Sequence, residues 1–158
     1  MKVNKSELHL KISDQISTLL TNARIAAMQA HETATHEENK AENKYDTLGL
    51  EAAYLAEGQS KRVLELQESL ATFNRQKVKE FSDDMEIGIG ALVCLKTALQ
   101  EKNYFFISPV AGGISIDYEQ FSITLLSPQS PLGYRLLSSF VGDEIALNGA
   151  SYEITMIY

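Results

Sequence analysis

The chain has 158 residues, a formal net charge of −7 and a sequence pI near 5.0. This length suits one ordinary domain or two small ones, and the acidic balance argues against direct binding of DNA through its phosphates. No apolar run approaches the roughly 20 residues that a membrane-spanning helix needs, and the lysines near the N-terminus are not followed by the apolar core of a signal peptide. We therefore expect a cytoplasmic protein with no membrane attachment.

The single cysteine, Cys94, lies in an apolar run and is expected to be a small buried side chain rather than a nucleophile.

Residues 6–36 contain neither glycine nor proline, and Ser6 is a suitable N-cap, so the first long segment is predicted to be a helix. Its apolar residues recur every three or four positions and form one stripe. The stripe consists of Leu8, Ile12, Ile16, Leu19, Ala23, Ala26 and Ala30. Because its members change from Leu and Ile to Ala, a partner helix should approach more closely toward the far end.

A second stripe with the same spacing predicts a second long helix. It consists of Leu48, Ala52, Leu55, Gln59, Val63, Leu66, Leu70 and Phe73. Two such helices joined by a short polar link are expected to fold back as an antiparallel hairpin, with small residues opposite small ones and bulky residues opposite bulky ones. Gly49 and Gly58 weaken the second helix, and we attribute them to close helix contact.

Beyond residue 82 the pattern changes to short β-like runs separated by turn signals such as Asn148-Gly149. The runs are residues 91–95, 104–108, 113–116, 121–126, 144–147 and 151–157. Ser130 followed by Pro131 predicts a short helix between the fourth and fifth runs. The predicted fold class is α+β: an antiparallel coiled-coil hairpin over residues 1–83, then a small antiparallel β-sheet domain with one short helix over residues 84–158.

The link between the two helices is strongly acidic, with seven carboxylates and two lysines from His31 to Glu57. A solvated loop is the usual interpretation of such a run. The alternative is an arm that carries carboxylates to a distant site, where they would suit Mg²⁺, a cation that prefers oxygen ligands. His31 and His36 are five residues apart and do not share a helical face, so they do not suggest a metal site. The sequence contains no phosphate loop, CxxC or HExxH motif.

Residues 126–157, LSPQSPLGYRLLSSFVGDEIALNGASYEITMI, resemble the C-terminal signature of the bacterial Gre family of transcription elongation factors. In that signature an SPxSPxG-like segment leads through a short Leu-rich helix to a Gly-Asp pair and a final pair of strands. The matching residues are Ser127, Pro128, Ser130, Pro131, Gly133, Leu136, Leu137, Gly142, Asp143, Ile145, Tyr152 and Ile154. The Gly-Lys pair usual after the leucines is Ser138-Ser139 here. The resemblance implies a coiled coil followed by an FKBP-like domain, and it extends over nearly the whole chain.

The resemblance also implies a role at the tip of the hairpin. In the family the coiled coil enters the secondary channel of RNA polymerase, where two tip acids help hold a second Mg²⁺ and the polymerase cuts its own backtracked RNA. Glu42, Asn43 and Asp46 occupy the position of that motif. Asp46 matches the second acid, whereas the first falls on the amide Asn43, with Glu42 just before it. Asp46 and Glu42 are thus candidate ligands of a weakly held Mg²⁺ shared with the polymerase, and no cofactor is expected on the chain alone.

The resemblance makes RNA polymerase the expected partner, with Ser130, Pro131, Gly133 and Asp143 as candidate docking residues. The nascent RNA 3′ end would be contacted only indirectly, DNA would not be bound directly, and the chain would be a monomer with no catalytic residues of its own. Because Asn43 replaces an acid, the protein either stimulates cleavage or modulates the polymerase without cleavage. The alternative function is an FKBP-like peptide-binding, prolyl isomerase or chaperone module with a coiled-coil spacer. The chain has no Trp that could form the base of an isomerase pocket, which argues against catalysis.

Overall fold

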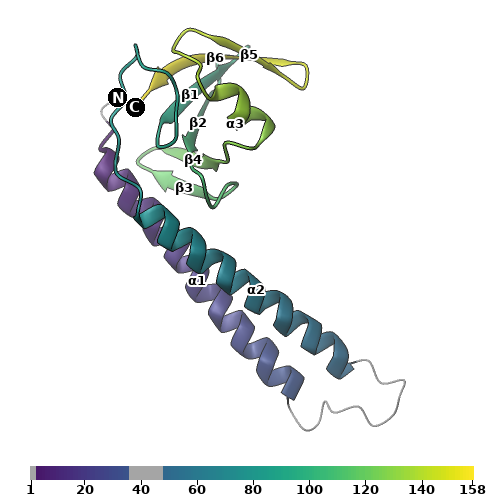
Figure 1. Cartoon of the computed structure of the whole chain (residues 1–158). Helices are drawn as coiled ribbons and strands as arrows, with labels where there is room; N and C mark the ends of the chain where they lie inside the picture. Colours follow the sequence, from purple (N-terminus) through teal and green to yellow (C-terminus); the bar gives the residue numbers. More distant parts are fainter. Residues whose placement is uncertain (1–2, 36–47) are drawn as a thin grey trace. The chain divides into compact units, whose positions relative to one another are not determined.

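The computed structural model describes residues 3–35 and 48–158 (Figure 1). Two long helices come first, α1 (Lys5–Thr35) and α2 (Leu48–Asn74). The elements that follow are β1 (Leu92–Thr97), β2 (Lys102–Ile107), β3 (Ser115–Tyr118), β4 (Phe121–Leu126), α3 (Pro131–Leu136), β5 (Glu144–Leu147) and β6 (Ala150–Ile157). The chain forms two compact units: Asp14–Ala71 is one, and Thr72–Tyr158 together with the chain up to Ser13 is the other.

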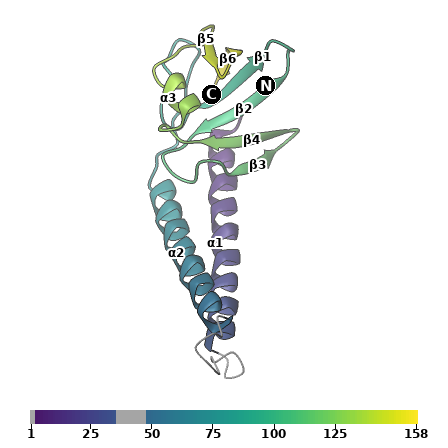
Figure 2. The same cartoon turned by 90° about the vertical axis from the view of Figure 1, so that its right-hand side faces the viewer.

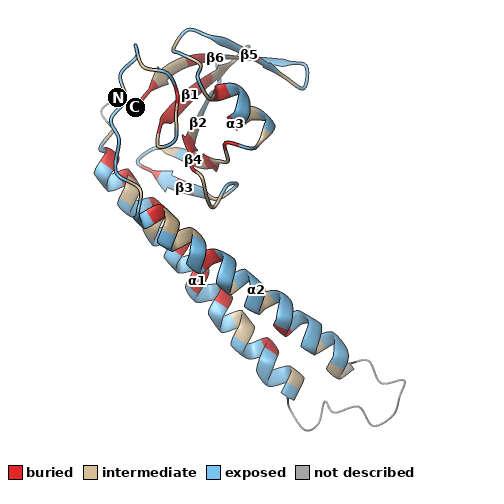
Figure 3. Ribbon diagram, in the orientation of Figure 1, coloured by how far each residue is buried: buried red, intermediate tan, exposed pale blue. Residues whose placement is uncertain are grey.

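The helical unit, Asp14–Ala71, contains most of α1 and α2, which lie side by side and run in opposite directions (Figures 1 and 2). Most of its buried apolar residues belong to the predicted stripes, and Figure 3 colours the buried residues of both helices red. They are Ile16, Leu20, Ala23, Ala30, Ala56 and Leu66. The predicted helical hairpin is therefore confirmed, and so is the change from bulky to small residues along α1. The prediction is wrong at two positions. Leu20, 5% exposed, takes the place expected for Leu19, because the stripe keeps its four-residue step for one turn longer. Leu55, expected in the second stripe, is 56% exposed, and the next residue, Ala56, is buried instead.

Two further details of the helices differ from expectation. The Asn4 side-chain oxygen accepts a hydrogen bond from the Glu7 backbone N–H at 3.1 Å, so Asn4, and not Ser6, caps α1. A Cβ built on Gly58 would meet no atom within 4 Å. Close helix contact therefore does not account for Gly58.

The six strands form one sheet in the order β3-β4-β2-β1-β6-β5. The predicted α+β class is confirmed, but the sheet is mixed rather than purely antiparallel, because β2 and β4 pair in parallel from Tyr104↔Ile123 to Ile107↔Leu126. The cause lies in the chain between them: β3 takes the edge position and pairs with β4, so β4 returns beside β2 in the same direction. The hairpin predicted at Asn148-Gly149 is confirmed, with φ values of 52° and 80° that suit a tight turn between β5 and β6.

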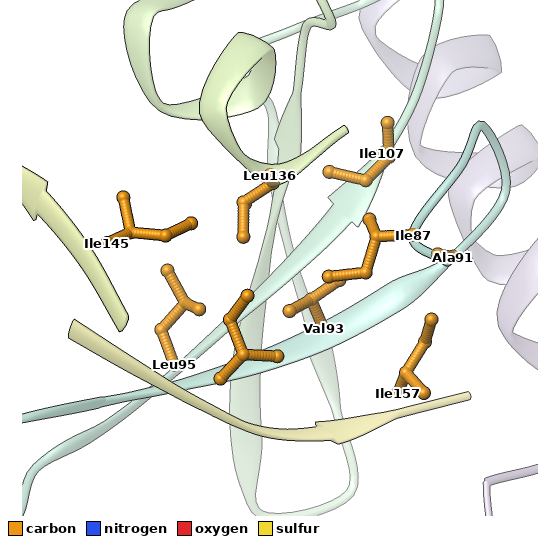
Figure 4. Close-up of a cluster of buried hydrophobic side chains, with 9 residues drawn as sticks. Ile87, Ala91, Val93, Leu95, Ile107, Leu136, Ile145 and Ile157 are labelled. Carbon is orange, nitrogen blue, oxygen red and sulfur yellow. The ribbon is translucent and has the colours of Figure 1, made fainter. Parts of the chain in front are cut away.

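The core of the sheet unit lies on the face that α3 covers (Figure 4). It consists of Ile87, Ala91, Val93, Leu95, Ile107, Leu136, Ile145, Ile154 and Ile157. The opposite face is covered as well, because Leu92 and Cys94 are fully buried and the Phe106 ring lies 6.2 Å from that of Phe73 at the end of α2. Both faces of the central strand β1 are therefore covered, and the predicted burial of Cys94 is confirmed.

The last strand departs from simple alternation. Cys94 pairs with Met156 while the next residue, Leu95, pairs with Ile154, so β6 carries one extra residue, Thr155, at a bulge. The Thr155 hydroxyl donates a hydrogen bond to the Cys94 carbonyl at 3.2 Å. The bulge explains why Ile154 and Ile157 are both buried although they are three residues apart.

Candidate functional site

The tip residues predicted to act, Glu42, Asn43 and Asp46, lie outside the residues that the structure describes. In the sequence they fall between the end of α1 at Thr35 and the start of α2 at Leu48. Within residues 3–35 and 48–158, no group of three or more His, Cys, Asp or Glu side chains could hold a metal ion. The assignment of Glu42 and Asp46 as shared Mg²⁺ ligands stays a prediction.

The candidate docking segment begins at the N-terminus of α3, where Ser130 has the extended backbone of an N-cap (φ −68°, ψ 154°). Its hydroxyl accepts a hydrogen bond from the Gly133 N–H at 3.0 Å and donates one to the Ser127 carbonyl at 2.7 Å. Pro131 follows at the first helical position, where the missing N–H costs nothing. The short helix predicted from Ser130-Pro131 is confirmed.

Gly133 is required by close backbone contact. A Cβ at this position would lie 2.0 Å from the Ser127 carbonyl oxygen and 2.9 Å from the Ser130 hydroxyl oxygen. The glycine thus lets the 127–130 turn fold against the first turn of α3. The resemblance to the family signature marked this residue, and the structure gives the physical reason for a glycine here.

Asp143 stabilises the next turn through two hydrogen bonds. Its carboxylate accepts a hydrogen bond from the Phe140 N–H at 2.8 Å, and its carbonyl accepts one from the Ile154 N–H at 2.9 Å, next to Gly142 with a φ of 93°. Ser130, Gly133 and Asp143 therefore shape the backbone of this segment. Their role in docking stays a prediction.

Exposed side chains of the same segment were missed by the sequence reasoning. Tyr134 is 75% exposed on α3 and Phe140 is 43% exposed in the loop that follows. Leu136, two residues after Tyr134, is fully buried in the core, so α3 has one face toward the sheet and another toward solvent. That periodicity was readable from the sequence and would have identified Tyr134 as an outward-facing aromatic residue.

A second feature of the sheet unit is a buried lysine at the start of α1. Lys5 is 4% exposed, and its ammonium donates hydrogen bonds to the Gly90 carbonyl and, at 2.8 Å, to the Tyr158 carbonyl. It also lies 5.2 Å from the centre of the Phe106 ring and 5.4 Å from that of Phe81. Burial lowers the pKa of Lys5 to about 8, although the negative charge of Glu80 acts to raise it.

His9 lies one helical turn after Lys5, and its ring stacks on that of Phe73 with centroids 4.3 Å apart. Burial lowers the pKa of His9 below 6.5, the positive charge of Lys5 lowers it further, and a hydrogen bond with the Phe73 backbone acts to raise it. Its Nε2 atom is buried without a hydrogen-bond partner among the described residues.

Lys5 and His9 line a groove of about 440 Å³ together with Lys77 and Lys79 from the segment after α2. We call it the Lys5 groove. Its apolar lining comes from Val78, Ile89 and Phe106, and all of its residues belong to the sheet unit. Sequence reasoning missed this site because its residues come from four separate stretches of the chain.

Comparison with protein-family models and with curated proteins finds no match. Among solved structures, the chain is similar to the GreA factor homolog 1 (Gfh1) of Thermus thermophilus, with 23% identity, 92% of this chain and 94% of that chain covered, and a TM-score of 0.40. It is also similar to Thermus aquaticus Gfh1, with 19% identity, 92% of each chain covered and a TM-score of 0.38. A further structure described as the transcription factor Gfh1 is 22% identical, with 92% of each chain covered and a TM-score of 0.40. At these identities and TM-scores, the likeness does not by itself assign an activity to this chain.

None of the helices in the described part of the chain combines the length and apolarity needed to cross a membrane.

Proposed function

We propose that this protein is a Gre-type factor that binds bacterial RNA polymerase and inserts its helical hairpin into the secondary channel. The observation that carries the proposal is the combination of two features in one chain. A hairpin of two long helices has Glu42, Asn43 and Asp46 in its connecting segment, and a sheet domain has the Ser130–Asp143 signature in a fully folded form. The protein would have no catalytic residues of its own and would act through the polymerase active site.

The length of the helical unit supports delivery to a recessed site. From Asp14 to the end of α1 at Thr35 the helix advances by about 1.5 Å per residue, or roughly 33 Å in all. The buried alanines Ala23, Ala30 and Ala56 let the two helices approach closely along this length. A narrow pair of helices suits a channel that a globular domain cannot enter.

The chemistry of the tip decides whether the protein would stimulate RNA cleavage or modulate the polymerase without cleavage. Glu42 and Asp46 supply carboxylate oxygens, the donor type that Mg²⁺ prefers, and Asn43 supplies a neutral amide oxygen. This donor set fits a shared Mg²⁺ held partly by the polymerase. A second cation in such a site would stabilise the attacking and leaving oxygens during cleavage of the RNA. With one acid replaced by an amide, this chain would hold the ion more weakly than a tip with both acids.

The test is transcript cleavage in halted, backtracked elongation complexes. If the protein stimulates cleavage, Asp46→Ala and Glu42→Ala should reduce the rate, while the matched control Glu57→Ala, which removes an exposed acid within α2, should not. Asn43→Asp, which restores the first acid, should raise the rate. A wild-type protein that binds the polymerase without stimulating cleavage would be a modulator, and absence of any binding to the polymerase would refute the proposal.

The FKBP-like alternative has a separate test. A peptide prolyl isomerisation rate no faster than the uncatalysed rate would remove catalysis by the sheet domain. Sedimentation would report a monomer if the hairpin folds within one chain and a dimer if the coiled coil is intermolecular.

A further inference from the structure

The Lys5 groove carries positive charge on an otherwise acidic protein. Three lysines and one histidine line it, and none of its lining residues is a carboxylate, whereas the whole chain has a net charge of −7. Glu80 acts on Lys5 but does not line the groove. Its volume of about 440 Å³ falls within the range of about 300–1,000 Å³ typical of small-molecule sites.

The groove also has an unsatisfied polar atom. Nε2 of His9 is buried without a hydrogen-bond partner among the described residues, a situation that costs free energy unless a ligand or water supplies the partner. Stacking on Phe73 holds the imidazole ring in place. An anion in the groove would favour the imidazolium form of His9, in which this nitrogen carries a proton, and would also lie near the Lys5 ammonium.

The other residues that line the groove indicate what kind of molecule would carry the anionic group. Val78 and Ile89 are 42% and 47% exposed, so apolar surface of the groove is available to a ligand. Lys77 and Lys79 flank Val78 and are exposed, with the Lys79 ammonium 4.7 Å from the centre of the Phe81 ring. Lysine ammonium groups are common phosphate binders, and several cations around one groove favour a phosphate with several charged oxygens over a single carboxylate.

We propose that the Lys5 groove binds a small phosphate-bearing ligand with an apolar or aromatic body, such as a nucleoside monophosphate. The phosphate lies among His9, Lys77 and Lys79, and the body lies against Val78 and Ile89. Lys5, whose ammonium already donates to two carbonyls, contributes mainly its charge. This site is separate from the tip residues and does not depend on the role proposed for them.

The test uses adenosine 5′-monophosphate as the probe and the His9 ring signals in NMR spectra of the full chain. We expect saturable shifts of the His9 signals and a raised His9 pKa in the bound state, because a nearby anion stabilises the imidazolium form. His31, on the helical unit, is the internal control and should not shift. Inorganic phosphate should bind more weakly than the nucleotide, and adenosine, which lacks the phosphate, should not bind.

Matched charge variants make the test specific. Lys77→Glu with Lys79→Glu should weaken binding by about tenfold or more, the loss expected when a charge-assisted contact worth about 1.5–3 kcal/mol is removed. Lys61→Glu with Lys102→Glu changes the net charge equally, at exposed positions outside the groove, and should change affinity by less than about twofold. All four positions are exposed, so both variants should fold. The proposal is overturned if chloride at equal ionic strength reproduces the His9 shifts, if both double variants weaken binding equally, or if inorganic phosphate binds as tightly as the nucleotide.

Discussion

The buried ammonium of Lys5 should make the stability of the sheet unit depend on pH in the alkaline range. Its pKa falls from 10.5 to about 8 on folding, because burial penalises the charged form. Below pH 8 the lysine is protonated in both states, whereas between pH 8 and 10.5 the unfolded chain holds a proton that the folded chain has released. The unfolded state then binds more protons, so the free energy of unfolding rises with pH. At about 1.36 kcal/mol per pH unit, the full rise is about 3 kcal/mol.

Urea unfolding between pH 7.5 and 9.5, followed by near-ultraviolet circular dichroism of the tyrosines, measures this rise. About 2 kcal/mol of it should be visible in that range. The range ends below pH 10 because burial raises the pKa of Tyr104 and of Tyr158 above 10.0, and these groups lower stability as they ionise.

Lys5→Met should abolish the slope, and Lys102→Met, at an exposed strand position, should retain it. The slope is a cleaner readout than stability at one pH, because Lys5→Met removes the burial cost of the charge and at the same time leaves the Gly90 and Tyr158 carbonyls without that donor. A wild-type stability that stays flat or falls from pH 7.5 to 9.5, or an equal slope in Lys5→Met, would refute this account of Lys5.

Three further predictions concern packing and are tested by denaturant or thermal unfolding. Gly133→Ala should destabilise the sheet unit by more than about 2 kcal/mol, because its Cβ would lie 2.0 Å from the Ser127 carbonyl oxygen, and an unchanged midpoint would contradict that contact. Gly58→Ala should stabilise the helical unit by about 1 kcal/mol, because nothing lies within 4 Å of the added methyl group; a loss of stability would reveal a contact not seen here. Leu66→Ala should cost about 2–5 kcal/mol, because Leu66 is 3% exposed, and Leu64→Ala, at a residue 61% exposed, should change stability by less than about 0.5 kcal/mol. Equal effects of the two leucine variants would argue against the packing of the hairpin.

The long helices were predictable because one periodic pattern recurs over many turns. The apolar stripe from Leu8 to Ala30 records which side of α1 is buried, and only its detail at Leu19 and Leu20 depended on the helical twist accumulated along the stripe. The strands β4 and β5 were also predicted with their observed bounds, because clear turn signals flank them. The parallel pairing of β2 with β4 was not predictable in this way, because it depends on where β3 finds its partner and not on the local sequence of either strand.

The candidate sites show the same difference between what local sequence indicates and what tertiary packing creates. Ser130, Gly133 and Asp143 belong to one continuous segment, so the resemblance to a family signature singled them out, and the structure added that each one shapes a turn. The Lys5 groove was missed because burial of a lysine among Phe81 and Phe106 results from tertiary packing. From the sequence alone, a lysine such as Lys5 near the start of a helix is expected to be solvated. Its burial, and therefore its lowered pKa, follows only from the packing of the folded chain.

The most direct test of the central claim is to locate the hairpin tip on the polymerase. Cys94 is fully buried, so a cysteine introduced by Asn43→Cys can be labelled selectively with a photo-crosslinker and bound to a halted elongation complex. Lys61→Cys, at an exposed position within α2, is the matched control. The account predicts that the label at position 43 crosslinks to the polymerase active-site region and the RNA 3′ end, whereas the label at position 61 does not reach them. Crosslinks from position 43 only to the outer surface of the polymerase, or none at all, would contradict it.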